Sequence, residues 1–424
     1  MVVVVLELAL VSGGWAAGPL PDFGAGSAGF ARVLGPRVFE FPRDHGAHPQ
    51  YRQEWWYFTG NLESDTGERF GFELTFFRYG LVGGVGAATD AAVGGAESAW
   101  RARQIYMAHF AVTDVGQRRF RSAEKVSRGA VGLAGARNPP LRVWVDDWVL
   151  GEVGAGVKGV SARAGDGGVD GGDAGARVRG VGAAGVAASS GGRDYGHWTL
   201  HAAEGGYELT LDAEALEAPV LNGDRGLSAK SSVPGSASYY YSIPRVAVHG
   251  RLIRDGKSID VHGLAWMDRE WGSGPLDQGW DWFALQLQDG SSLMFYSLRN
   301  RDGSRDSHSA GTWVSSAGAA RPLAAGDVQI DVLDYWKNVR GERYPSRWRV
   351  RAPAVGVDVE VRPVLADQEL TTAPRYWEGA VDVVAAGDGR APGAQRTDGR
   401  DAGDAVSGKA GGRGYVELVG YAAQ

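Results

Sequence analysis

Carboxylic acids embedded among tryptophans are the most chemically suggestive feature of this sequence. The segment VHGLAWMDREWGSGPLDQGWDWF, residues 261–283, carries one histidine, two candidate acids and four tryptophans: His262, Asp268, Glu270, Trp266, Trp271, Trp280 and Trp282. Apolar surroundings disfavour the charged form of a carboxyl group and raise its pKa. Such a group can stay protonated near neutral pH and act as a general acid, and indole faces stabilise a cation. The segment therefore suits protonation of an alkene, or of another weak base, in an apolar pocket.

A structural role explains the same residues and is favoured by composition alone. Asp268, Arg269 and Glu270 can form salt bridges at the corner of a hairpin, and aromatic side chains commonly dominate core packing. Arg269 also argues against the acid hypothesis, because a neighbouring cation lowers the pKa of a carboxyl group. We expect only one of the two carboxyl groups to face a pocket.

A second cluster lies in FPRDHGAHPQYRQEWWYFTGNL, residues 41–62. It combines two histidines and an acid with three consecutive aromatic residues: His45, His48, Glu54, Trp55, Trp56 and Tyr57. The histidine spacing could suit a metal ion, with Asp44 or His109 as a further ligand, but no helix or strand context supports it. Structural histidines are favoured, and no metal site is predicted. We expect EWWYF to begin a strand and form an aromatic wall. A further hypothesis places the loop before it against the DREWG corner of a second domain.

Several classes of enzyme and partner are excluded or disfavoured by the sequence as a whole. Gly-x-Ser-x-Gly, the motif of the α/β-hydrolase serine, does not occur. His-Glu-x-x-His, the motif of a zinc-binding helix, is also missing. There are no cysteines, which excludes thiolate catalysis and disulfides. The 44 basic and 50 acidic residues give a net charge of -6 with both signs interspersed, which argues against a nucleic-acid partner.

The elements that must position these residues are strands. In RFGFELTFFR the residues Phe70, Phe72, Leu74 and Phe76 recur at every second position, which is typical of a strand with one buried face. YELTLDA, VDVEVRP and YVELVGY repeat the alternation more briefly, and Asp-Gly turns join paired runs. No long amphipathic helix is evident. Many sequential hairpins predict an all-β protein built as a sandwich or barrel.

Three segments break this pattern. Residues 1–30 begin with an apolar run at 2–11, which is too short to span a bilayer and resembles a secretory signal. We therefore expect a leader and export to the periplasm or the extracellular space. Residues 150–193 and 385–413 are rich in Gly and Ala, a composition that buries too little apolar area to offset its ordering entropy. Both are predicted to be flexible insertions between strands.

Two distant hairpin-like segments share one layout. EWWYFTGNLESDTGERFGFELTFFR ends in Arg78, and GWDWFALQLQDGSSLMFYSLR ends in Arg299. Each has a pair or near-pair of tryptophans, a turn with Gly, and an aromatic-rich strand. This echo favours a duplicated β-domain. We place the boundary near Pro244, with residues 31–245 and 246–424 as the two domains.

Seven motifs occur in one order along the chain: FPRDHGAHPQYRQEWWYFTGNL, GFELTFFR, LRVWVDDW, LNGDRGLSAK, ASYYYSIPR, MDREWGSGPLDQGWDWFALQL and YWEGAV. Together with the terminal GYVELVGY they resemble the lipocalin-like family of carotenoid 1,2-hydratases and AttH-like predicted secreted hydrolases. The resemblance covers most of residues 38–383. It implies two lipocalin-like antiparallel β-barrel or sandwich domains packed together.

The resemblance also implies a chemistry. In the hydratases an aspartate is thought to protonate the alkene, and Asp268 best matches that role. This implies a cofactor-independent enzyme that hydrates an apolar isoprenoid or lipid-like substrate, since the reaction needs only a proton, a stabilised cation and water. Glu270, His262, His45 and Glu54 are the further catalytic candidates. The candidates for substrate binding are all aromatic: Trp55, Trp56, Tyr57, Trp266, Trp271, Trp280, Trp282 and Tyr240.

Two other functions stay open. The same cluster of histidine and carboxyl groups could activate water in a secreted hydrolase of esters or lactones. Lipocalin-like barrels also hold small apolar ligands without reacting with them, so a non-catalytic carrier is the second class. The expected partner is a small apolar molecule in each case. Peripheral membrane contact is a further open alternative, and the sequence sets no oligomeric state.

Overall fold

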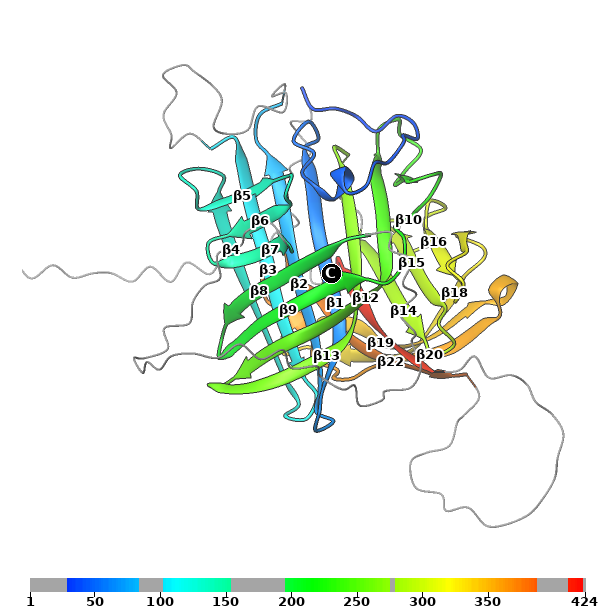
Figure 1. The fold of residues 1–424 in the computed structure, drawn as a ribbon. Helices are drawn as coiled ribbons and strands as arrows, with labels where there is room; N and C mark the ends of the chain where they lie inside the picture. The colour runs from blue at the N-terminus through cyan, green and yellow to red at the C-terminus, as the bar shows by residue number, and fades with distance from the viewer. Residues whose placement is uncertain (1–28, 84–101, 154–194, 275–278, 387–410, 422–424) are drawn as a thin grey trace, which may run out of the picture.

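The protein is described by a computed structural model that covers residues 29–83, 102–153, 195–274, 279–386 and 411–421. Most of these residues belong to antiparallel strands that form two sheets (Figure 1). The helices in these ranges are two single 3-10 turns, η2 (Arg43–His45) and η3 (Pro353–Val355). No helix within the same ranges is long and apolar enough to cross a membrane. The predicted all-β class is confirmed.

Three sequence predictions fall mainly outside the described residues. Of the expected leader, only residues 29 and 30 are described. The two Gly/Ala-rich tracts correspond chiefly to 154–194 and 387–410, which lie outside the described ranges. Their described ends are strands, since β7 (Trp148–Glu152) enters the first tract, and β22 (Tyr376–Ala385) and β23 (Gly412–Val419) flank the second.

The first sheet holds the strands before residue 273. Its order is β4-β3-β2-β1-β13-β12-β9-β8-β7-β6-β5, with β10 and β11 also paired to β12. The bounds not yet given are β1 (Gln53–Ser64), β2 (Arg69–Gly80), β3 (Gln104–Asp114), β4 (Arg119–Arg128), β5 (Ala134–Arg137), β6 (Arg142–Val145), β8 (His197–Glu204), β9 (Tyr207–Ala215), β10 (Val220–Leu221), β11 (Leu227–Ala229), β12 (Ala237–Arg254) and β13 (Lys257–Gly272). The first strand thus pairs with the last, and the sheet nearly closes into a barrel.

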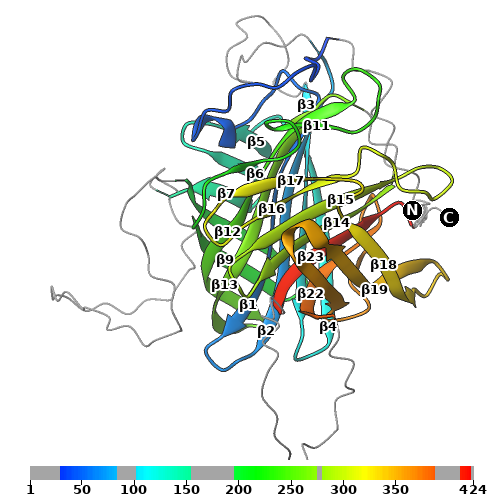
Figure 2. The same ribbon diagram turned by 90° about the vertical axis from the view of Figure 1, so that its right-hand side faces the viewer.

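The second sheet packs against the first as a half-barrel (Figure 2). Its order is β17-β16-β15-β14-β23-β22-β20-β19-β18, with β21 also paired to β22. The remaining bounds are β14 (Gly279–Leu287), β15 (Ser292–Arg299), β16 (Ala310–Val314), β17 (Ala320–Ala324), β18 (Gln329–Lys337), β19 (Arg343–Ala352), β20 (Val357–Pro363) and β21 (Glu369–Leu370).

The two sheets repeat one connectivity. In each, the first strand lies between the second strand and the last strand: β1 between β2 and β13, and β14 between β23 and β15. The hairpins that echo each other in the sequence, β1–β2 and β14–β15, therefore occupy equivalent places. The arginine that closes each hairpin pairs with an acid of the first strand, Arg78 with Glu54 and Arg299 with Asp281. The expected architecture of two lipocalin-like domains is confirmed.

The division between the sheets differs from the expected boundary at residue 245. β12 runs through that position, and both β12 and β13 pair within the first sheet. The change of sheet falls between Gly272 and Gly279. Pro244 sits at a register shift between Ile243 and Val246. Because a bulge tolerates the missing N–H of proline, the strand continues past it.

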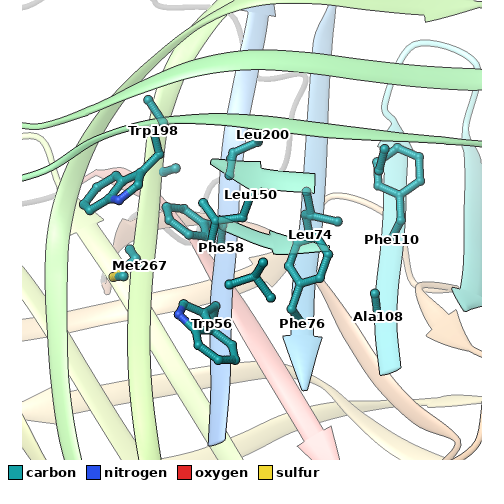
Figure 3. Close-up of a cluster of buried hydrophobic side chains, with 14 of the residues drawn as sticks. Trp56, Phe58, Leu74, Phe76, Ala108, Phe110, Leu150, Trp198, Leu200 and Met267 are labelled. Carbon is teal, nitrogen blue, oxygen red and sulfur yellow. The ribbon is translucent and has the colours of Figure 1, made fainter. Parts of the chain in front are cut away.

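Strand alternation divides the side chains of the first sheet between two environments. Trp56, Phe58, Leu74 and Phe76 point into the core of the first barrel, as Figure 3 shows. Alternate residues of the same strands point to the other side of the sheet. That side is covered by the second sheet, so polar residues such as Glu73 are buried too. The first sheet is therefore buried on both faces where the domains meet.

The loop before β1 is joined to the first barrel by a buried ionic network. Glu54 pairs with Arg78 and with Arg269, whose Nη2 lies 3.1 Å from Glu54 Oε2. The Arg269 guanidinium lies 4.1 Å from the centre of the Trp56 ring and donates to Gly46 O at 2.5 Å. Burial alone would raise the pKa of Glu54, but Arg78, His48 and Arg269 hold it below its usual value. The network keeps Glu54 ionised.

We predict that Glu54→Ala destabilises the fold strongly without removing a group from the cavity described below. Removing one partner leaves Arg78 and Arg269 as buried, uncompensated charges, at a cost of about 3–5 kcal/mol. Chemical denaturation measures this loss as a fall in the free energy of unfolding.

The matched control is Glu63→Gln. Glu63 pairs with Arg413 at 2.9 Å, but both side chains are more than a third exposed, and such pairs contribute about 0–1 kcal/mol. Equal losses in the two variants would contradict the assignment of Glu54 to a buried network.

Candidate functional site

A cavity of about 840 Å³ lies between the two sheets. Its walls come from β1, β2, β3, β12 and β13 of the first sheet and from β14, β15, β22 and β23 of the second, with loops at 29–32 and 230–236. Aromatic rings form much of the surface, among them Trp55, Tyr57, Tyr240, Trp280, Trp282 and Tyr376. The volume is within the range of small-molecule sites in proteins.

Asp268 is held on the cavity wall by three hydrogen-bond donors. Its Oδ2 accepts from the Tyr240 hydroxyl at 2.5 Å, and its Oδ1 accepts from Ser242 Oγ at 2.5 Å and from the Trp266 indole at 2.7 Å. The Trp282 indole donates in turn to the Tyr240 hydroxyl at 3.1 Å. Asp268 is only 4% exposed, so its position is set by these four side chains.

The electrostatic setting of Asp268 favours its protonated form. Burial raises the pKa of Asp268 to about 7, against the opposing effect of the three donors and with a smaller contribution from Glu270. The group is therefore close to half protonated at neutral pH. The same donors stabilise the carboxylate that forms when the proton leaves. This combination is what a general acid needs.

Glu270 lines the same cavity, contrary to the expectation that only one of the two carboxyl groups would do so. Residues two apart in a strand point to the same side. Glu270 accepts from Ser238 and lies 2.8 Å from Lys230 Nζ. Arg269 points to the opposite side, into the first barrel. The charge of Arg269 is therefore paired with Glu54. The argument from the sequence that Arg269 would lower the pKa of Asp268 is wrong.

Three further carboxyl groups line the cavity and were missed by sequence reasoning: Glu73, Glu378 and Glu417. Burial raises the pKa of Glu73 and that of Glu378, and it raises the pKa of Glu417 to about 8. Each stands within an apolar strand, in GFELTF, YWEGAV and YVELVG. An acid at the centre of a buried strand is the signal that could have identified them, because such residues are rarely buried without a specific role or partner.

Cross-strand register places many of the polar side chains between the sheets in two facing rows. In the first sheet the row is Ser242, Asp268, Tyr57, Thr75, His109 and Glu124, each the register partner of the next. In the second sheet the row is Tyr296, Trp282, Glu417 and Glu378. The rows meet where Tyr57 donates to Glu378. Trp282 of the second row also donates to Tyr240, which lies two residues before Ser242 on β12. Residues hundreds of positions apart thus form one polar layer.

Several predicted site residues lie outside this layer. Trp56, Trp271 and Glu54 face the first barrel, and the His48 ring stacks on Trp271 at 3.8 Å between centroids. His45 binds the Tyr241 hydroxyl through Nδ1 at 2.6 Å, also on the barrel side. The loop at 41–52 does contact the DREWG corner through Arg269, but within one domain, since β13 belongs to the first sheet. These residues therefore lie on the barrel side of the first sheet, away from the cavity.

His262 is also placed away from the cavity. Its side chain is 60% exposed and its nearest acid is Asp65, at 3.8 Å. The histidine that lines the cavity is His109. Among the described residues, no group of three or more histidine or acidic side chains is arranged to hold a metal ion.

Comparisons with known proteins agree with this fold. The sequence model of the AttH-like family matches residues 32–171 and 173–421. A crystal structure of a protein designated AttH (NE1406) from Nitrosomonas europaea is 29% identical, with a TM-score of 0.69 over 92% of this chain and 99% of that one. Kievitone hydratase from Nectria haematococca has a similar fold, with a TM-score of 0.59 and 11% identity over 92% of this chain and 96% of that one. No curated protein sequence matches significantly. Since the match to the family model extends over most of this chain, the chain belongs to the AttH-like family.

Proposed function

We propose that the protein is an acid-catalysed enzyme of the hydration type that adds water to a double bond of an apolar, isoprenoid or lipid-like substrate. The observation that carries the proposal is Asp268, a buried and readily protonated carboxyl group on the wall of an aromatic cavity. An alkene is a weak base, so its protonation needs a donor kept in an apolar site and a surface that tolerates a cation.

The cavity supplies both requirements. Asp268 donates its proton to the alkene carbon, and Tyr240, Ser242 and Trp266 stabilise the carboxylate left behind. The faces of Trp55 and Trp282 offer electron-rich surface to the carbocation. Water then adds to the cation. No step calls for a cofactor.

The fold shared with kievitone hydratase supports the reaction class, because that protein is named for a hydration. The choice of an isoprenoid rests on the resemblance to carotenoid hydratases seen in the sequence. Export of the chain and contact with a membrane surface are likewise predictions from the sequence. They are consistent with an apolar substrate.

A non-catalytic carrier is the second candidate, favoured by the size and aromatic lining of the cavity. A hydrolase of esters or lactones is the third, with His109 rather than His45 or His262 as the histidine in the cavity. Incubation with an acyclic carotene such as lycopene separates the classes by mass spectrometry. A product heavier by one water supports hydration, whereas unchanged carotene that co-purifies with the protein supports the carrier.

Asp268→Asn is expected to lower turnover by about 10²–10⁴-fold, the range for one general acid. The amide fills the same space, and its oxygen can still accept from Ser242 and Trp266, so the fold should persist. Steady-state kinetics give the loss, and circular dichroism checks the fold. Glu54→Gln, in the network on the other side of the sheet, serves as the control for changes that affect the barrel alone. Full activity in Asp268→Asn would exclude Asp268 as the acid.

The pH dependence of kcat/KM should reveal the acid directly. Asp268 must be protonated to act, and its pKa is raised to about 7. We expect kcat/KM to fall as pH rises through about 7, by about tenfold per pH unit above it. A rate that instead rises through pH 7 would indicate that Asp268 acts as a base, which would favour the hydrolase.

A further inference from the structure

Six side chains that the proposed acid step does not use follow one another across the interface, joined by four hydrogen bonds and by one pair of carboxyl groups, Glu73 and Glu378. They are Glu124, His109, Tyr376, Glu73, Glu378 and Tyr57, drawn from β4, β3, β22, β2, β22 and β1. The chain crosses between the two sheets four times. It runs from a partly exposed carboxyl group to the cavity wall beside Asp268.

The outer end of the chain is Glu124. Its side chain is 23% exposed, and its Oε2 lies 3.2 Å from His109 Nε2. His109 itself is fully buried. Glu124 is thus the one member of the six with substantial exposure, and it can exchange protons with bulk water.

The next links cross to the second sheet and return. His109 Nδ1 lies 2.7 Å from the Tyr376 hydroxyl, which donates to Glu73 Oε1 at 3.1 Å. When Glu73 is ionised, the Tyr376 hydroxyl donates to it. When Glu73 carries the proton, the hydrogens can reverse, so that Glu73 donates to the Tyr376 oxygen, Tyr376 donates to His109 Nδ1, and His109 Nε2–H donates to Glu124. The histidine is connected on both sides, as a group that passes protons must be.

Glu73 and Glu378 meet as a carboxyl pair. Each group acts on the pKa of the other, and Glu73 Oε2 and Glu378 Oε2 are both buried without a hydrogen-bond partner among the described residues. Two buried carboxyl groups in contact cannot both ionise, so the pair retains a proton. The other titratable groups that face the pair are Tyr57 on β1, His109 on β3, Tyr376 on β22, and Tyr415 and Glu417 on β23.

The inner end of the chain is Tyr57. Its hydroxyl donates to Glu378 Oε1, and its ring lines the cavity at 5.2 Å from that of Trp282. Tyr57 is the register partner of Asp268 on the neighbouring strand, so their Cα atoms are about 4.5–5.5 Å apart. The acid and the end of the chain therefore stand side by side on one wall.

We propose that these six side chains form a proton relay that removes the proton released by water during hydration and passes it to the surface at Glu124. The inference rests on the proposed hydration for its chemical purpose. Tyr57 and Glu378 form the receiving end, and Tyr376, His109 and Glu124 carry the proton onward to the surface.

The protons balance over one turnover. The O–H bond of Asp268 breaks as a C–H bond forms at the alkene, and water then forms a C–O bond to the carbocation. The added water releases a proton to Tyr57, which passes its own proton to Glu378. One proton of the Glu73–Glu378 pair leaves through Tyr376 and His109 to Glu124 and bulk water. Asp268 then takes up one proton from bulk solvent, equal to the proton released at Glu124, so the net reaction consumes one water molecule and no proton.

The activity test compares two kinds of variant on an acyclic carotene. Glu378→Gln should lower kcat by about 10²–10⁴-fold, as for a group that receives the proton directly. His109→Gln and Glu124→Gln should lower kcat by about tenfold or more, equivalent to about 1.4 kcal/mol in barrier height, with KM unchanged. Formate or imidazole in the buffer should restore part of the kcat of Glu124→Gln, because Glu124 is open to solvent. A purely structural role predicts no such rescue.

The matched control is Asp212→Asn. Asp212 pairs with His197 at 2.6 Å across β8 and β9, in the same sheet but away from the cavity. This variant also breaks a cross-strand pair of histidine and acid, and it should keep full kcat. A loss equal to that of Glu124→Gln would overturn the relay.

A second measurement needs no substrate. After the protein is mixed into D₂O, infrared spectroscopy follows the C=O stretching band of the protonated carboxyl group in the Glu73–Glu378 pair. The band is assigned by its loss in Glu73→Gln and Glu378→Gln. Exchange should be slower in His109→Gln and Glu124→Gln than in the wild type by about tenfold or more, and unchanged in Asp212→Asn. Equal rates would overturn the relay even in an active hydratase. Slowed exchange in a protein that leaves the carotene unchanged would refute the hydration and retain the relay.

Discussion

The burial of carboxyl groups between two β-sheets is the constraint on which the rest of this structure depends. An isolated carboxylate is costly to remove from water, so each must find a cation, find several donors, or keep its proton. Successive side chains of a strand point to opposite faces of the sheet. One face of the first sheet can therefore carry the buried carboxyl groups and their partners, while the other face packs into the core of the barrel. β1, β2 and β13 each do so, with apolar residues in the barrel and polar residues in the layer between the domains.

Glu54 and Asp268 show how the environment decides what a buried acid does. Glu54 lies among Arg78, Arg269 and His48, which hold its pKa low, and it accepts hydrogen bonds from the loop before β1. Asp268 lies on the neighbouring strand of the same sheet but on its other face, among hydroxyl and indole donors, and no described residue forms a salt bridge with it. Its pKa rises to about 7. Asp268 and Arg269 are consecutive residues of β13, so their side chains lie on opposite faces of the sheet, Asp268 in the cavity and Arg269 in the barrel.

The duplicated domain explains why the site is where it is. A single sheet of this connectivity buries one face in its own barrel and leaves the other open. Two copies packed together cover those open faces and enclose a cavity whose walls come from both. Links such as Tyr57 to Glu378 and Trp282 to Tyr240 then serve stability and the proposed chemistry together. Such a site depends on the relative placement of the domains more than on any single motif.

Much of the architecture was predictable from the sequence, because strand alternation and turn residues act over a few neighbouring positions. Phe70, Phe72, Leu74 and Phe76 indicated a buried face, and the two echoing hairpins indicated a duplication; both hold in the structure. Asp268 could be selected from its tryptophan neighbours. The boundary near Pro244 could not be placed well, because a bulge absorbs a proline that the sequence alone presents as a break.

The membership of the site was decided only by the tertiary structure. Which side of β1 and β13 faces the second sheet depends on the register of strands far apart in the chain, and this register sent His45, Glu54 and Trp271 to the barrel. It brought Glu73, His109, Glu378 and Glu417 to the cavity instead. By itself the sequence determined the strands, their repetition and one acid among indoles. The partners of that acid were set by long-range pairing between sheets, since no local pattern records which buried faces will meet.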